Sequence, residues 1–170
     1  SLLAAGIGCA LLAAVSGTTP ASAGEAQAAV MGPSGLPLPR FVSLKSNRIN
    51  LRVGPGRDCA VQWLHVKPGL PVEIVQEYDN WRRIRDADGT EGWVLQTLLS
   101  GKRSAIAAPW GANGGGDPVP LFSRAEEHAE LAARLEPGVL GKVEACDGNW
   151  CKFEASGYDG FVRQTDIWGA

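Results

Sequence analysis

The sequence predicts an all-β protein that consists of two similar small units. Glycine accounts for 22 of the 170 residues and proline for 11, a share that favours tight turns and short strands over long helices. Short β-compatible runs are separated by turn-forming residues, and a pattern of about 50 residues occurs twice along the chain. With 45% hydrophobic residues, the chain is too apolar to be disordered.

The first 23 residues have the pattern of a secretory signal peptide. Every residue from Leu2 to Val15 is apolar or glycine, and the small-residue sequence Ala21-Ser22-Ala23 follows. We therefore expect residues 1–23 to be removed and the protein to be exported, to the periplasm or the extracellular space. The alternative is a short transmembrane anchor, but the apolar run is below the roughly 20 residues that a spanning helix needs. We expect no membrane span in the mature chain.

Residues 24–40 are predicted to form a flexible linker. The stretch from Gly32 to Arg40 reads GPSGLPLPR, which is rich in proline and glycine and has too little apolar surface to fold alone. The first folded unit is expected to follow it.

Residues 47–101 and 117–169 match each other as an internal repeat. The clearest matches are Pro68-Gly69 with Pro137-Gly138, Asp79-Asn80-Trp81 with Gly148-Asn149-Trp150, and Gly92-Trp93-Val94 with Gly160-Phe161-Val162. The predicted domains are therefore a first unit at 41–104, a glycine-containing connector at 105–117 and a second unit at 118–170. Units of this size are near the lower limit for an independent core, so we expect two neighbours that share some buried surface.

The strands of the first unit are predicted from short runs and the turns between them. Ile74-Val75, residues 82–85 and residues 93–95 are β-compatible, and turn residues separate them. Residues 86–89, Asp-Ala-Asp-Gly, are expected to form a hairpin turn, because a calcium loop would need its glycine at the sixth position rather than the fourth. This spacing predicts a small barrel of hairpins.

One stretch of the second unit favours a helix when it is taken alone. Residues 123–126 have the form of a helix-capping box, and alanine, glutamate and leucine are frequent in residues 125–136. The matching stretch of the first unit, residues 53–66, contains Gly54-Pro55-Gly56 and would make a poor helix. We give the repeat more weight and predict a loop followed by a strand.

The first unit resembles the bacterial SH3-like (SH3b) domains. The segments that carry the resemblance are residues 49–56, 68–74, 80–84 and 92–94. The second unit departs from the pattern at residues 122–125 and at Phe161, and is identified mainly through its alignment to the first. The resemblance implies two tandem SH3-like barrels, five-stranded and half open, which are used in the bacterial envelope to bind, often beside a cell-wall hydrolase.

Three cysteines lie in the mature chain. Cys146 and Cys151 bracket a turn-rich tetrapeptide, which would place them on facing strands of one hairpin. In an oxidising compartment we expect them to form a disulfide, since a metal site would lack a second pair of ligands. Cys59 is expected to be a small buried thiol, with intermolecular pairing as the alternative.

The sequence holds few groups that could perform catalysis. It contains two histidines, His65 and His128, and neither a G-x-S-x-G nor an H-E-x-x-H pattern. A cysteine hydrolase that used Cys151 or Cys59 with His128 is conceivable, but no part of the chain is left to build its catalytic domain. We predict that the protein is not an enzyme and uses no cofactor and no metal ion.

Charge differs between the two units. The net charge is −2, so the molecule as a whole has no general attraction to nucleic acid or to an anionic membrane surface. Residues 40–103 hold 11 Lys/Arg and 7 Asp/Glu, whereas residues 104–170 hold 5 and 10. The charges of the basic first unit either meet an anionic ligand or only orient the two units against each other.

Trp81, Arg83, Arg85 and Trp150 are the predicted ligand-binding residues. Side chains alternate along a strand, so if Ile84 fills the core, Trp81, Arg83 and Arg85 face outward together. A ring flanked by two guanidinium groups suits a ligand that bears carboxylates. By the resemblance, Trp81 and Trp150 align with the tryptophan that lines the peptide groove of SH3-like barrels, with packing as the alternative role. Most of the other tryptophans are expected in the core.

These observations predict an exported, non-enzymatic module that binds peptidoglycan or another cell-envelope ligand. The alternative is an interaction or targeting subunit for a separate cell-wall hydrolase, with an envelope protein as its partner. No nucleic acid is expected among the partners.

Overall fold

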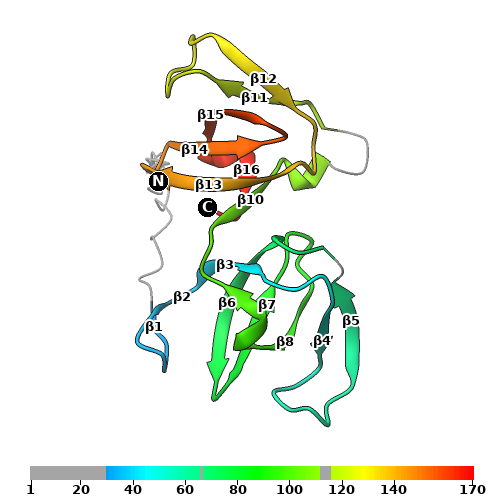
Figure 1. Ribbon diagram of the computed structural model, residues 1–170. Helices are drawn as coiled ribbons and strands as arrows, with labels where there is room; N and C mark the ends of the chain where they lie inside the picture. The colour runs from blue at the N-terminus through cyan, green and yellow to red at the C-terminus, as the bar shows by residue number, and fades with distance from the viewer. Residues whose placement is uncertain (1–29, 66, 112–115) are drawn as a thin grey trace, which may run out of the picture.

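The computed structural model describes residues 30–65, 67–111 and 116–170, most of which lie in short β-strands (Figure 1). The strands form two seven-stranded sheets and one two-stranded sheet, and the strand pairs in the described residues are antiparallel, so the all-β prediction is confirmed. The predicted signal peptide lies outside the described residues. Within those residues, no helix is long and apolar enough to cross a membrane.

The first barrel is built from seven of these strands. They are β3 Arg40–Leu44, β4 Ile49–Arg52, β5 Val61–His65, β6 Pro71–Tyr78, β7 Trp81–Arg85, β8 Glu91–Leu95 and β9 Leu99–Ser100, with the 3-10 helix η1 Gln96–Leu98 before the last. Their order across the sheet is β5-β4-β8-β7-β6-β3-β9. The predicted turn joins β7 to β8, with Gly89 at a φ of 83° and its amide donating to the carbonyl of Asp86.

The second barrel repeats this topology strand for strand. Its elements are β10 Ser104–Ala107, η2 Pro109–Gly111, β11 Val119–Phe122, β12 Leu131–Leu135, β13 Leu140–Cys146, β14 Trp150–Ala155, β15 Tyr158–Arg163, η3 Gln164–Asp166 and β16 Ile167–Trp168. The order across the sheet is β12-β11-β15-β14-β13-β10-β16. Residues 123–130 form no helix and β12 follows them, so the predicted loop and strand are confirmed.

The boundary between the barrels differs from the prediction. Residues 105–117 were predicted as a connector, but Ala105 and Ala107 belong to β10, which pairs with β13 and β16. Both alanines are fully buried, and a strand of four residues with such small side chains gives little β signal in a sequence. Residues 101–103 therefore link the barrels. Each sheet has seven strands, whereas the resemblance implied five. Two further strands extend each sheet, β3 and β9 in the first barrel and β10 and β16 in the second.

The predicted flexible linker contains a hairpin in its described part. β1 Val30–Met31 pairs with β2 Pro37–Leu38, and Gly35 lies in the intervening turn at a φ of 75°. Ser34 donates from its amide and its hydroxyl to the Glu77 carboxylate at 2.9 and 2.8 Å. This polar attachment to the first barrel orders a segment whose composition alone predicts none.

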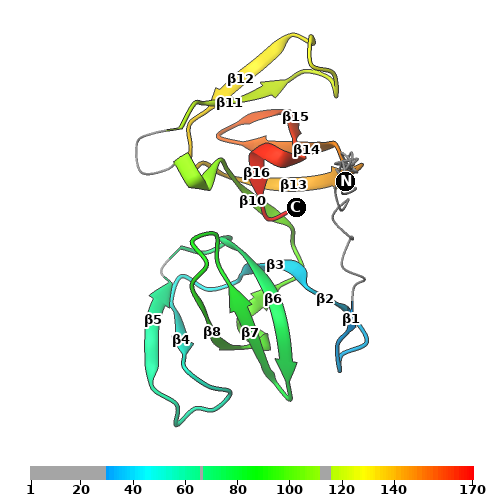
Figure 2. The same cartoon turned by 180° about the vertical axis from the view of Figure 1, so that it is seen from behind.

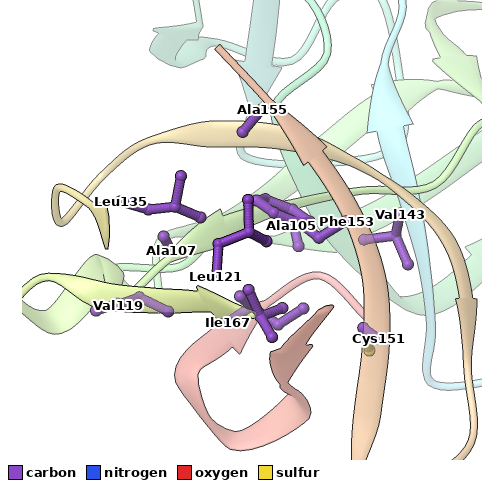
Figure 3. Close-up of a cluster of buried hydrophobic side chains, with 12 residues drawn as sticks. Ala105, Ala107, Val119, Leu121, Leu135, Val143, Cys151, Phe153, Ala155 and Ile167 are labelled. Atoms are coloured by element: carbon purple, nitrogen blue, oxygen red, sulfur yellow. The ribbon is translucent and has the colours of Figure 1, made fainter. Parts of the chain in front are cut away.

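Each barrel has its own core. In the first, the buried side chains are Leu44, Ile49, Leu51, Val72, Ile74, Ile84 and Val94. In the second, the cluster includes Val119, Leu121, Val143, Phe153 and Ile167 (Figure 3). Tryptophan contributes less than predicted: Trp81 is the one buried among the six, whereas Trp63 and Trp110 are 58% and 66% exposed, on the edge strand β5 and in η2.

One cross-strand position is occupied differently in the two barrels. Cys146 on β13 faces Cys151 on β14, and the predicted disulfide joins them. The equivalent pair on β6 and β7 is Glu77 with Arg82, both buried, with Nε and Oε1 3.2 Å apart. Cys59 is free, as predicted, and half-buried.

The two barrels contact each other beside their link. The rings of Phe41 and Trp168 meet edge to face with their centroids 5.1 Å apart. Ser104 Oγ donates to the carbonyl of Gly69 at 2.6 Å. Figure 1 and Figure 2 both show β10 entering the junction between the two lobes, so the barrels are neighbours as expected for units of this size.

Candidate functional site

The first barrel carries a hollow of about 280 Å³ beside Trp81, which we call the first groove. Its lining residues are Arg48, Asn50, Arg52, Arg57, Trp81, Leu95 and Leu98. They come from β4 and its flanks, the start of β7, the end of β8 and η1. The volume is close to the lower end of the range for small-molecule sites.

Trp81 forms the aromatic wall of the first groove and is more buried than predicted. It begins β7 directly after a turn in which Asp79 has a φ of 47°, and it pairs with Leu95 on β8. Gln96 closes this turn, because its backbone amide donates to the Asn80 carbonyl and its Nε2 donates to Asn80 Oδ1, both at 2.9 Å. Trp81 is 8% exposed, so the ring is not the open platform that strand alternation predicted.

Arg83 and Arg85 do not line the first groove. Both are exposed, and each has a carboxylate partner: Arg83 lies 2.7 Å from Glu91, and Arg85 lies 2.5 Å from Glu73. Hydrogen bonding to Glu73 raises the pKa of Arg85. A strand rises about 3.3 Å per residue, which carries Arg85 about 13 Å along β7 from Trp81. Residues on one face of a strand therefore need not belong to one site.

Arg48, Arg52 and Arg57 supply the positive charge of the first groove, and the sequence reasoning did not single them out. Arg52 Nη1 donates to the Cys59 carbonyl at 2.6 Å, which holds the loop after β4 in place. Arg48 and Arg57 are exposed and form no ion pair with any described residue. The sequence signal that could have identified them is the alternation of polar residues 48, 50 and 52 with apolar residues 49 and 51, which places the polar side chains together on the outer face of the strand.

The equivalent position in the second barrel holds an aromatic and ionic cluster, which we call the second cluster. Trp150 is half-buried, and its ring meets Phe122 edge to face with the centroids 5.6 Å apart. The Arg163 guanidinium lies over the Trp150 ring, 4.4 Å from its centroid, and forms an ion pair with Glu127. Here the arginine is already engaged by groups of the protein itself.

Asp147 fixes the backbone of the turn that leads into Trp150. Its Oδ1 accepts the amide protons of Trp150 and Asn149, each at 2.8 Å. These hydrogen bonds, the one from Trp150 first, lower the pKa of Asp147. Gln164 then donates from its amide to the Asn149 carbonyl at 2.9 Å, as Gln96 does to Asn80 in the first barrel. The turn before each tryptophan is thus fixed in the same way.

The first groove and the second cluster differ at two equivalent positions, where one barrel has an arginine and the other an apolar residue. Arg52 on β4 corresponds to Phe122 on β11, because both pair with the middle of the next strand. Leu95 on β8 corresponds to Arg163 on β15, because each faces the tryptophan of its barrel. The first groove is therefore the more cationic of the two and its exposed arginines have no acidic partner in the described chain.

The chemistry that the first groove supports is recognition of an anionic group. Guanidinium groups donate paired hydrogen bonds to carboxylates, and an indole ring offers an apolar wall beside them. Among the described residues, no group of three or more His, Cys, Asp or Glu side chains is arranged to hold a metal ion.

Comparison with solved structures finds remote likenesses. Two proteins from Trichomonas vaginalis, NlpC2 and NlpC1, each share 11% identity with this chain at a TM-score of 0.34, over 76% of this chain and 48% and 45% of theirs. An NlpC/P60 family protein from Bacillus cereus shares 8% identity at a TM-score of 0.33, over 75% of this chain and 55% of its own. This chain spans about half the length of these proteins, and likenesses so remote carry no functional conclusion.

Comparison with protein families is more informative. No protein with a curated description matches the sequence. The family model described as "Bacterial SH3 domain" matches twice, at residues 45–101 and at residues 115–169, which together make up more than half of the chain. Each match falls on one barrel and covers all of its strands but the first, β3 or β10, and the strand orders of the two barrels are equivalent. The chain therefore belongs to the bacterial SH3 domain family and carries two tandem copies of the domain.

Proposed function

We propose that the protein is an exported, non-enzymatic module that binds peptidoglycan through the first groove. The observation that carries the proposal is the set of three arginines around Trp81, two of them exposed and without an acidic partner in the described chain. Bacterial SH3 domains are cell-wall binding modules, and both barrels belong to this family.

The first groove has the chemistry that a stem peptide of peptidoglycan requires. Such peptides bear carboxylates, which arginine binds through two parallel hydrogen bonds. Arg52 is held in place by the Cys59 carbonyl, while Arg48 and Arg57 remain available to a ligand. The Trp81 ring and Leu95 supply apolar surface for the rest of the peptide. Trp150 in the second cluster is a weaker candidate, because Arg163 and Phe122 already contact its ring.

Export is supported by the apolar segment and the small-residue pattern at residues 1–23. The Cys146–Cys151 disulfide fits an oxidising compartment outside the cytoplasm. The intact mass of the protein recovered from the cell envelope should correspond to a chain that starts at Gly24. A mass that still includes Leu2 to Val15 would contradict export with cleavage.

Co-sedimentation with purified peptidoglycan sacculi tests the binding function. The variant R48Q/R57Q removes two groove arginines and should weaken binding at least about tenfold, since each charge-assisted hydrogen bond contributes on the order of 1 kcal/mol or more. The matched control R83Q/R85Q removes two charges from the same barrel outside the groove and should change binding less than about twofold. Equal losses in both variants would show that general charge, not the groove, binds the wall.

Two further assays, capture from an envelope extract and turnover of muropeptides, test two other roles. If sacculi do not bind but a wall hydrolase is captured from an envelope extract, the protein is a targeting subunit rather than a wall-binding module. If the purified chain alone releases products from muropeptides, it is an enzyme. The proposal predicts neither result.

A further inference from the structure

A cleft of about 580 Å³ lies between the two barrels. One wall is formed by the end of β3, the turn before β6 and the chain from the end of β9 to the link. The other is formed by the starts of β10 and β13 and by the end of β14 with the turn that follows it. None of its lining residues lines the first groove or belongs to the second cluster. We call it the inter-barrel cleft.

The inter-barrel cleft is strongly cationic. Lys45, Lys102 and Arg103 line it from the first barrel and the link, Lys142 lines it from the second, and all four are exposed. Glu154 is the one carboxylate among the lining residues; it lies 3.7 Å from Lys142 Nζ, which is also 3.6 Å from Glu144 outside the lining. The other three cations form no ion pair with a described residue. The cleft is therefore positive even though the second barrel as a whole is acidic.

Between these charges the cleft is lined by aliphatic and small residues. Leu44, Leu140 and Ala155 belong to the lining, and the stems of the lysines add apolar surface. The hydrogen bond from Ser104 Oγ to the Gly69 carbonyl joins the two walls at 2.6 Å. A ligand that combines negative charges with small apolar groups fits this lining better than a polymer of phosphates, which has no apolar groups to place there.

We propose that the inter-barrel cleft is a second ligand site, which binds an acidic peptide segment. Its carboxylates meet Lys102, Arg103 and Lys142, and its small apolar side chains lie against Leu140. The site is additional to the first groove and does not depend on the proposed function. Because both barrels contribute a wall, the bound peptide also holds them in one relative position.

Titration of the purified chain with the synthetic peptide (Ala-Glu)4, followed by amide NMR signals, tests this site. The signals of Gly69 and Gly141 in the cleft should shift, and that of Leu95 in the first groove should not. The variant K102Q/R103Q should weaken binding about tenfold, since two charge-assisted hydrogen bonds are lost. The control R124Q/R134Q removes two exposed charges of the second barrel outside the cleft and should change binding less than about twofold. E154Q should strengthen binding, because it removes the carboxylate that repels the ligand.

Three outcomes would overturn the proposal. Equal weakening in the two double variants would reduce the effect to general charge. Tighter binding of inorganic tripolyphosphate, or equal binding of the neutral peptide (Ala-Gln)4, would assign a different ligand class. Shifts confined to the first groove would place the peptide there and leave the cleft without a ligand, while the sacculus assay would still decide the proposed function separately.

Discussion

At the scale of single residues, the two cores fill the same space with different pairs of side chains. In the first barrel, Val72 on β6 and Ile84 on β7 are both buried in the core. The equivalent residues of the second barrel are Gly141 on β13 and Phe153 on β14. A Cβ at Gly141 would collide with the Phe153 ring and would lie 2.7 Å from the Glu154 carbonyl. The Phe153 ring, which is larger than the Ile84 side chain, therefore fits because residue 141 is a glycine.

Gly141→Ala should lower the free energy of unfolding of the second barrel by about 2 kcal/mol, because an overpacked core forces neighbours to move. Phe153→Ile in the same chain should restore part of the loss by making room for the new methyl group. Gly101→Ala, where a Cβ would meet nothing within 4 Å, is the control and should change stability by less than about 0.5 kcal/mol. Denaturant unfolding measures all three. If the two alanine variants were equally stable, the packing argument would be wrong.

At the first groove, local sequence patterns predict some features, whereas others depend on strands that are distant along the chain. The polar turn before Trp81 agrees with the sequence reasoning, because such a turn before an aromatic residue is a local pattern. The place of Trp81 beside a groove was implied only by the family resemblance, and strand alternation predicted a more exposed ring. The burial of its ring is set by strands that are distant along the chain. The same holds for Arg48 and Arg57, which reach Trp81 through the pairing of β4 with β8 and of β8 with β7.

At the scale of elements, β6 with β7 and β13 with β14 are equivalent hairpins stabilised by different chemistry. The Glu77 carboxylate is buried, and it accepts hydrogen bonds from Arg40 at 2.6 Å and from Ser34. Burial alone would raise its pKa, but these hydrogen bonds outweigh burial and lower the pKa of Glu77 to about 2. The second hairpin has a covalent bond at the same place.

The first barrel should lose stability in acid through Glu77. Its folded pKa of about 2 is below the ordinary value of 4.5, so the stabilisation is complete above pH 4.5 and is lost as the pH falls towards 2. The loss should be about 3 kcal/mol by linkage. Glu77→Gln should be less stable at neutral pH and should lack this part of the acid dependence. Glu136→Gln, at an exposed glutamate, is the control; an unchanged pH profile in the Glu77 variant would contradict the assignment.

The disulfide of the second barrel should be a modest stabiliser. Because it closes a loop of a few residues, its reduction should cost about 2 kcal/mol or less. Non-reducing peptide mapping should find Cys146 joined to Cys151 and Cys59 unmodified. Recovery of Cys59 in a disulfide with either one would contradict the strand pairing of β13 with β14.

The elements themselves were largely predictable, with exceptions that have a physical cause. The repeat was decisive for residues 123–135, where local composition favours a helix but the topology of the first barrel requires a loop and a strand. β10 was missed because Ala105 and Ala107 carry little β-propensity, and their burial depends on the strands on either side. The hairpin of β1 and β2 was missed because its order comes from Glu77, 43 residues away from Ser34.

At the scale of the whole molecule, two domains of one family present different surfaces. The first barrel is basic and has an open groove, whereas the second is acidic and covers its equivalent tryptophan with its own arginine. The barrels are joined through Phe41, Trp168 and the Ser104 hydrogen bond, so the cationic inter-barrel cleft exists only in the tandem arrangement. The two copies of the domain therefore present two different surfaces rather than one surface twice.

The most direct test of the central claim is an NMR titration of the chain with a soluble disaccharide-peptide fragment of peptidoglycan. We expect saturable shifts of the Trp81 indole signal and of the Arg52 and Leu95 amides, with Trp150 unaffected, and in R48Q/R57Q the same shifts should need at least about tenfold more ligand. An absence of shifts, or shifts confined to Trp150 or to Gly69 and Gly141 in the inter-barrel cleft, would contradict the claim that the first groove binds the wall.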